Sequence, residues 1–217
     1  MAQKIIRYEG KQESVTWDSR LCIHVGECGR AAGDLFVAGR KPWCDPDLAS
    51  QEEAEDVVSR CPTGALARTT PDGTLVEESA SAENTIHVAA DGPLYLSGDL
   101  EIDGAEQDMP SVKRRAALCR CGASSAKPFC DGSHKKKGFD DSGAIGGSKL
   151  ELKETGGQLK VGRSTNGPLI VKGNVTLYSG AGRKAWQGKF AALCRCGASK
   201  TKPFCDGSHS AAGFEAD

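Results

Sequence analysis

Short runs of apolar and β-branched residues, separated by glycine, dominate the second half of the chain. Leu94–Leu96 and Leu100–Ile102 flank Gly98, and the runs QLKVGR and LIV follow further along. Runs of this length predict strands that are joined by turns or bulges. Another strand-like run, KLELKE, is expected at 149–154, with Gly156 and Gly157 as a hairpin turn behind it.

Residues 1–80 follow a different pattern, in which two predicted strands, KIIRY and VTW, precede a predicted helix. The helix is SQEEAEDVVSRCP at 50–62, where Ser50 and Glu53 have the spacing of a capping box and Pro62 ends the helix. Its apolar positions fall on one helical face: Ala54, Val57, Val58 and Cys61. The pattern therefore predicts a mixed α+β fold for this part of the chain.

The chain matches itself, without a gap, at a shift of 75 residues. CRCGASSAKPFCDGSH at 119–134 lies over CRCGASKTKPFCDGSH at 194–209. Two copies are too few for a solenoid, and two similar units commonly pair about a pseudo-twofold axis. We therefore expect an α+β protein with an N-terminal domain at 1–75, followed by a mainly-β pair of units at 84–141 and 149–217.

Each copy carries three cysteines and a histidine in the spacing C-x-C-x8-C-x3-H. Thiolate and neutral imidazole are favoured ligands of iron and zinc. Cys119 and Cys121 point the same way on an extended strand, so they can bind one metal together. Cys130 and His134 lie one helical turn apart, with a helix expected to begin near Asp131, and can bind a second metal. The second copy repeats this set: Cys194, Cys196, Cys205 and His209.

Zinc and disulfides are the alternatives to iron. Three cysteines and one histidine are also a common zinc set, although C-x-C is tighter than the usual zinc spacing. The sequence shows no signal peptide and no apolar run of about 18 residues, so a cytoplasmic location is expected. Thiols stay reduced there, which argues against disulfides.

The string C-x-C-x2-S-x3-P-x-C-D-G-S-H, complete in both copies, resembles the CDGSH iron–sulfur family, also called NEET. The resemblance implies one 2Fe–2S cluster in each unit. Cys119 and Cys121 would bind one iron, and Cys130 and His134 the other. The second unit would likewise set two cysteines against a cysteine and a histidine: Cys194 and Cys196 against Cys205 and His209. It also implies a β-cap exchanged between the units, here within one chain, so a monomer with an internal pseudo-dimer is expected.

The histidine ligand has two expected consequences. A neutral imidazole in place of a thiolate makes the oxidised cluster less negative, so its reduction potential should lie above that of plant-type ferredoxins. Imidazole is also protonated once its iron bond loosens, so cluster loss should accelerate below about pH 6.

The N-terminal domain holds the remaining cysteines in part of a bacterial ferredoxin pattern. Cys22 and Cys28 match the first and third ligands of C-x2-C-x2-C, and Cys61, followed by proline, supplies the distant ligand. The segment WDSRLCIHVGEC…CPTGAL resembles the divergent single-cluster 4Fe–4S ferredoxin-like domain. Three thiolates suit a 3Fe–4S cluster, and a fourth ligand, His24 or Cys44, permits 4Fe–4S. Cys44 is equally compatible with a half-buried free thiol, and His24 with a hydrogen-bonding neighbour of the cluster.

Charge adds little to this interpretation. The formal net charge is −1, so no global field favours nucleic acid or a membrane, although residues 1–80 carry 9 Lys and Arg against 14 Asp and Glu. We expect an electron-transfer protein with two 2Fe–2S clusters and one 4Fe–4S or 3Fe–4S cluster, working with a redox partner protein. The alternative is cluster transfer to an apo acceptor, or redox or pH sensing by labile clusters. No enzymatic activity is expected.

Overall fold

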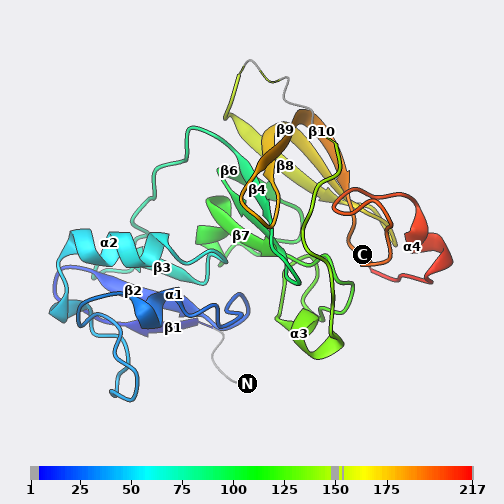
Figure 1. Cartoon of the computed structure of the whole chain (residues 1–217). Coiled ribbons are helices and arrows are strands. Elements are labelled where there is room, and N and C mark those ends of the chain that lie inside the picture. Colours follow the sequence, from blue (N-terminus) through cyan, green and yellow to red (C-terminus); the bar gives the residue numbers. More distant parts are fainter. Residues whose placement is uncertain (1–4, 148–151, 153, 217) are drawn as a thin grey trace.

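The computed structural model describes residues 5–147, 152 and 154–216, and Figure 1 shows its N-terminal domain beside the two repeated units. The strand expected at 149–154 lies largely outside the described residues. Within the described ranges, no helix is long and apolar enough to cross a membrane.

The N-terminal domain packs one helix on a three-stranded antiparallel sheet. The strands follow the order β1 (Ile5–Tyr8), β2 (Ser14–Asp18) and β3 (Leu66–Thr69). Two short helices, α1 (Glu27–Arg30) and η1 (Pro46–Leu48), come before α2 (Gln51–Ser59). The predicted capping box of Ser50 and Glu53 is present, and Ala54, Val57 and Val58 of the expected face are buried. This face packs with Val15 and Leu66 from the sheet. The helix ends at Ser59, before the expected Pro62, so Cys61 lies beyond it and is only partly buried.

The two repeated units share one seven-stranded sheet, whose main path is β6-β8-β9-β4-β5-β7, with β10 alongside β9. The first unit supplies four short strands: β4 (Thr85–Val88), β5 (Leu94–Ser97), β6 (Asp99–Ile102) and β7 (Arg115–Leu118). The second unit supplies three longer strands: β8 (Gln158–Arg163), β9 (Leu169–Tyr178) and β10 (Lys184–Leu193). A short turn, η2 (Pro110–Lys113), precedes β7.

Equivalent strands are exchanged between the units. β6 of the first unit pairs in parallel with β8 of the second. Reciprocally, β4 of the first unit pairs in parallel with residues 176–178 of β9. The C-terminal half of β9 is the counterpart of β6 at the shift of 75 residues. The exchange therefore has the pseudo-twofold character that the repeat predicts, and the α+β fold class is confirmed.

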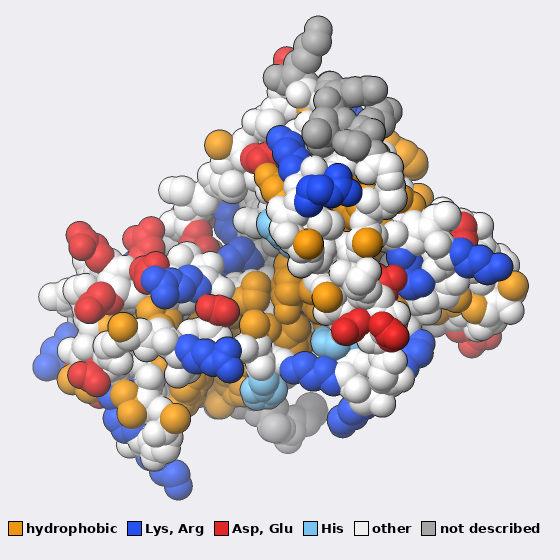
Figure 2. Space-filling view, viewed as in Figure 1, with side chains coloured by type: hydrophobic (Ala, Val, Ile, Leu, Met, Phe, Trp, Pro, Cys, Tyr) orange, Lys and Arg blue, Asp and Glu red, His pale blue; other side chains and the backbone are white. Residues whose placement is uncertain are grey.

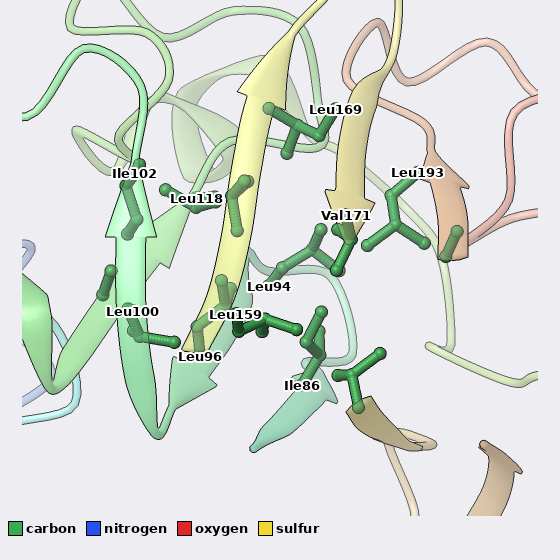
Figure 3. Packing of buried hydrophobic residues seen from close by; sticks show 14 of the residues in the cluster. Ile86, Leu94, Leu96, Leu100, Ile102, Leu118, Leu159, Leu169, Val171 and Leu193 are labelled. Carbon is green, nitrogen blue, oxygen red and sulfur yellow. The ribbon is translucent and has the colours of Figure 1, made fainter. Parts of the chain in front are cut away.

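One hydrophobic core lies between these strands and extends into the N-terminal domain. Figure 3 shows part of it, where Leu94 and Leu118 of the first unit and Leu169 and Leu193 of the second lie in one buried cluster. Leu21 and Ala65 of the N-terminal domain belong to the same buried cluster as Met109 and Val112 of the first unit. Because burial of apolar surface drives such packing, the N-terminal domain is fixed to the first unit rather than tethered to it.

Polar contacts reinforce this junction. The buried Arg115 donates a hydrogen bond of 2.8 Å to the carbonyl of Val58, at the end of α2. At the edge, Arg20 pairs with Glu106 at 2.9 Å and with Asp108 at 3.0 Å. The side chains of Glu106 and Asp108 are more than half exposed. These two pairs therefore orient the N-terminal domain on the first unit more than they stabilise the fold.

Candidate metal centres

Backbone hydrogen bonds bring the distant cysteines of the first unit together. The N–H of Cys119 donates to the carbonyl of Pro128 at 2.8 Å, and the N–H of Cys130 donates to Ala117 at 2.9 Å. The expected strand for the C-x-C pair is wrong, because β7 ends at Leu118 and both cysteines lie in the loop that follows it. The end of β7 and this loop run beside the segment that carries the third cysteine. Residues far apart in the motif become neighbours through this pairing.

The side chains of the first unit then form two pairs. The Sγ atoms of Cys119 and Cys121 are 3.7 Å apart, and Cys130 Sγ lies 3.3 Å from His134 Nδ1. Two sulfurs bound tetrahedrally to one metal at about 2.3 Å lie about 3.8 Å apart, and a sulfur and an imidazole nitrogen about 3.6 Å. Both pairs are therefore close to the spacing at which each could bind one metal.

The helix after the third cysteine begins slightly later than expected. Helix α3 is Ser133–Lys137, and the residue before it is Gly132 in a left-handed conformation rather than Asp131. The carboxylate of Asp131 still accepts the N–H of Ser133 at 2.9 Å. The glycine turn is what rotates the chain so that His134 returns toward Cys130.

The second unit repeats most of this arrangement. Cys194 N–H donates to Pro203 at 2.7 Å, Cys205 N–H donates to Ala192 at 2.9 Å, and the Sγ atoms of Cys194 and Cys196 are 3.7 Å apart. Helix α4 (Ser208–Ala211) carries the histidine. Its Nδ1 atom lies 3.4 Å from the hydroxyl of the next residue, so the imidazole orientation differs from that in the first unit.

Backbone N–H groups point at the ligand sulfurs in both units. Ala123 and Gly132 donate to Cys121 and Cys130, each at 3.4 Å. The second unit has the same bonds at 3.4 and 3.5 Å, from Ala198 to Cys196 and from Gly207 to Cys205. Hydrogen bonds to thiolate sulfur stabilise negative charge and influence the potentials of iron–sulfur clusters.

The environment of the first unit also favours the metal-binding form of its imidazole. Burial lowers the pKa of His134, and the nearby charge of Lys135 lowers it further. The hydrogen bond between Cys119 and Cys121 lowers the pKa of Cys121 and raises that of Cys119. Burial raises the pKa of Cys130 to about 11. The set therefore supplies a neutral imidazole and one readily formed thiolate, and metal binding drives the remaining deprotonation.

A buried arginine between the first two cysteines was not expected to have a structural role. Arg120 is 1% exposed and donates to the carbonyls of Gly92 and Ala89 and to the carboxylate of Asp141. Its counterpart Arg195 is 0% exposed and donates to the carbonyls of Gly167 and Ser164. The sequence did hold a sign of this role, which is that the same arginine stands between the two cysteines in both copies. A charged residue repeated between two metal ligands implies that it has a specific partner.

The N-terminal thiols surround a cavity instead of forming pairs. Cys22, Cys28 and Cys61 line a cavity of about 390 Å³, together with mainly apolar side chains from the 22–29 loop and from Trp17 and Trp43. Burial raises the pKa of Cys28, and the charges of Cys61 and Cys22 raise it further, so the three thiols interact electrostatically. Figure 2 shows hydrophobic side chains in the hollow between this domain and the repeats.

The two candidates for a fourth N-terminal ligand occupy different surroundings. His24 lines the cavity, and its Nδ1 atom lies 4.0 Å from Cys22 Sγ. Cys44 is fully buried in the core under α2, paired through its backbone with Phe36, and does not line the cavity. Burial raises the pKa of Cys44 to about 12. The placement therefore favours His24 over Cys44.

The donor sets fit iron–sulfur clusters. Among the described residues, no three His, Cys, Asp or Glu side chains converge as they would on one metal ion. A two-iron cluster requires a pair of protein ligands for each iron, because bridging sulfides complete the coordination. A larger cluster requires thiols spread around a cavity, as they are in the N-terminal domain.

Comparison with known proteins identifies families for the segments that carry these cysteines. The family model described as "Iron-binding zinc finger CDGSH type" matches residues 91–135 and 166–210. The model described as "Divergent 4Fe-4S mono-cluster" matches residues 8–71. No solved structure matches the chain.

Two curated relatives are both called "Uncharacterized protein YjdI", one from Escherichia coli strain K12 and one from E. coli O157:H7. Each is 39% identical over 59 residues, which are 27% of this chain and 78% of the relative. The family matches identify an iron–sulfur protein. The chain belongs to the CDGSH iron-binding family, with two CDGSH units behind an N-terminal divergent 4Fe–4S mono-cluster domain.

Proposed function

We propose that this protein transfers single electrons between partner proteins in the cytoplasm and carries three iron–sulfur clusters. The CDGSH units would each hold a 2Fe–2S cluster, on Cys119, Cys121, Cys130 and His134 and on Cys194, Cys196, Cys205 and His209. The N-terminal domain would hold a 4Fe–4S cluster on Cys22, Cys28 and Cys61, with His24 as its fourth ligand. A 3Fe–4S cluster is the alternative if His24 does not bind.

The burial of the first ligand set is the observation that supports electron transfer most directly. Cys119, Cys121 and Cys130 are 1–2% exposed, and His134 is 7% exposed. Electron transfer needs no ligand to leave, whereas cluster donation requires an acceptor thiol to reach the iron. A buried ligand set suits the first process better than the second.

The bound clusters supply one-electron redox centres, and the rest of the chemistry belongs to the chain. The backbone N–H groups of Ala123 and Gly132 stabilise the thiolates, and Arg120 fixes the ligand loop. Next to Cys130 in the chain, Phe129 anchors this segment in the main hydrophobic core and is 4% exposed. Such a fixed environment keeps the ligands in place whichever oxidation state is present.

The test is metal analysis followed by a redox titration of anaerobically purified protein. We expect eight irons and eight sulfides per chain for the 4Fe–4S assignment, seven irons for 3Fe–4S, and reversible reduction steps in electron paramagnetic resonance and visible spectra. A colourless protein, or clusters that are destroyed by a single reduction, would exclude electron transfer.

Cluster transfer is the second candidate, and the second unit favours it. Cys196, Cys205 and His209 are only partly buried, so an acceptor thiol has access that the first unit denies. Mixing holo protein with an apo-ferredoxin tests this, with the acceptor's spectrum as the readout. Transfer that is complete before any reductant is added would favour donation as the main activity.

A further inference from the structure

The two CDGSH units have the same ligand string but unequal cover. Cys121 and Cys130 are 2% exposed and His134 is 7% exposed, whereas all three counterparts in the second unit are partly exposed. Ala117, behind the first site, is buried, but its counterpart Ala192 is only half-buried. In Figure 1, α3 lies toward the N-terminal domain and α4 lies at the opposite edge of the molecule. The difference therefore comes from what lies against each unit.

The N-terminal cluster loop covers the first unit. Ile23, between two candidate N-terminal ligands, is 5% exposed and forms a buried cluster with Ala117 and Cys130. A Cβ atom added to Gly132 would lie 4.0 Å from Ile23 Cβ, so the isoleucine also reaches the turn that carries the histidine. One side chain thus links the N-terminal cavity to the ligand face of the first unit.

Tyr95 completes this contact. Its side chain packs against the same buried cluster, as does that of Val25. Burial raises the pKa of Tyr95, and the charges of Cys130 and Cys61 raise it further, so the phenol lies within electrostatic reach of both ligand sets. The second unit has Ile170 at the matching position, and among the described residues the buried cluster that holds Ile23 includes none from the second unit.

We propose that Ile23 and Tyr95 are positioning residues that seal the ligand face of the first CDGSH unit under the N-terminal domain, so that the second unit loses its cluster first. This proposal depends on the proposed function in one respect, which is that both units hold clusters. Identical ligand strings then have different lifetimes, because a ligand set opens only when the contact covering it opens. No oxidant or reductant is needed, since cluster loss here is ligand release to a chelator.

The experiment follows both units separately within one sample. Holo protein at pH 7, with its iron content measured beforehand, is incubated with an iron chelator and pulsed with iodoacetamide, which alkylates released cysteines. Tryptic peptides with Cys130 and Cys205 differ in sequence, so mass spectrometry resolves them. We expect the second-unit peptide to be labelled roughly ten times faster, as for a difference of about 1.4 kcal/mol in opening free energy.

Matched variants locate the cause. Tyr95→Ile gives the first unit the residue of the second, and Ile23→Ser removes the apolar cover; both should speed labelling of Cys130 toward the rate of Cys205. Tyr95→Phe should keep the parent order, and Ile170→Ala should leave Cys130 unaffected. Equal labelling in the parent, or an order that survives both Tyr95→Ile and Ile23→Ser, would overturn the proposal. An iron-free sample would instead overturn the proposed function, so the two failures are distinguishable.

Discussion

Replacing Arg120 with alanine removes the buried charge that holds the first ligand loop. The guanidinium bonds Gly92, Ala89 and Asp141, the last at 2.5 Å, and lies 4.8 Å from the ring centre of Phe139. Truncation leaves three carbonyls, those of Gly92, Ala89 and Asp141, without this donor, and it leaves a carboxylate whose side chain is only 17% exposed without its closest cation. We therefore expect Arg120→Ala to destabilise the protein strongly and to reduce the iron content of the first unit.

The magnitude follows from burial. Removing one partner of a buried ion pair costs about 3–5 kcal/mol. Asp141 keeps Lys202 at 3.6 Å, so the lower end, about 3 kcal/mol, is the expected loss. For a chain of 217 residues this corresponds to a fall in the melting temperature of about 6–12 °C.

Thermal unfolding of holo protein, followed by circular dichroism, is the assay. The control is Arg60→Ala, which breaks an ion pair with Asp56 whose side chains are 51% and 54% exposed, and which should cost less than about 1 kcal/mol. If Arg120→Ala lowers the melting temperature no more than this control, the arginine is not the clamp that its contacts indicate.

The same ion pair predicts a pH dependence. Burial alone would raise the pKa of Asp141, but the hydrogen bond from Arg120, the N–H of Gly143 and the charges of Arg120 and Lys202 outweigh it and lower the pKa. Its stabilisation is therefore complete above the unfolded pKa of about 3.9 and is lost only as pH falls through the lower folded value. The difference in unfolding free energy between the parent and Asp141→Asn should be equal at pH 7 and pH 5.5. A difference that shrinks in this range contradicts the assigned direction.

Three further predictions concern the cluster sites. Cys44→Ala should lower the unfolding free energy by about 1 kcal/mol but leave the iron content unchanged. His24→Ala should instead lower the iron content of the N-terminal site. If both variants lose the same amount of iron, Cys44 is a ligand after all. Gly122→Ala should lower the unfolding free energy by about 2–3 kcal/mol and release iron from both CDGSH units, because its Cβ would lie 2.4 Å from a carbonyl of the opposite unit. Gly182→Ala has a similar backbone conformation in open space, and it should cost only about 1 kcal/mol. His209→Cys should slow the loss of visible absorbance below about pH 6, since a thiolate replaces the protonatable ligand, and unchanged decay would argue against imidazole release.

Local features of the sequence predicted the ligand strings, the capped helix and most strands. The capping box of Ser50 and Glu53 needs only neighbouring residues, so its signal is complete in the sequence. The pairing of Cys119 with Cys121 is also local, although the pair lies in the loop after β7 and not on the strand that the spacing predicted. The repeat also predicted two units that pair with each other. The repeat alone indicates that the two units pair, although it does not say which strands lie next to each other.

Contacts between distant segments could not be read from the sequence. Ile23 and Tyr95 belong to no periodic pattern, and their meeting depends on how the N-terminal domain docks. Cys44 resembled the other cysteines by type, and only the packing under α2 separates it from the cavity. Arg120 would normally be assigned to the surface, because its partners lie 21–31 residues away in the chain.

Covalent fusion explains why the two units can differ. In a homodimer both copies have one sequence, so a segment that binds an N-terminal domain on one side must bind another on the opposite side. Here the two units differ in the segment that leads from the exchanged strand, which is β6 or the C-terminal half of β9, to the ligand loop. In the first unit it forms η2, where Ser111 donates to the carbonyl of Leu66 at 3.0 Å, and in the second unit it extends the β9–β10 hairpin. The two ligand strings are alike, as binding the same group requires, whereas the connecting segments differ, and the first of them contacts the N-terminal domain through Ser111.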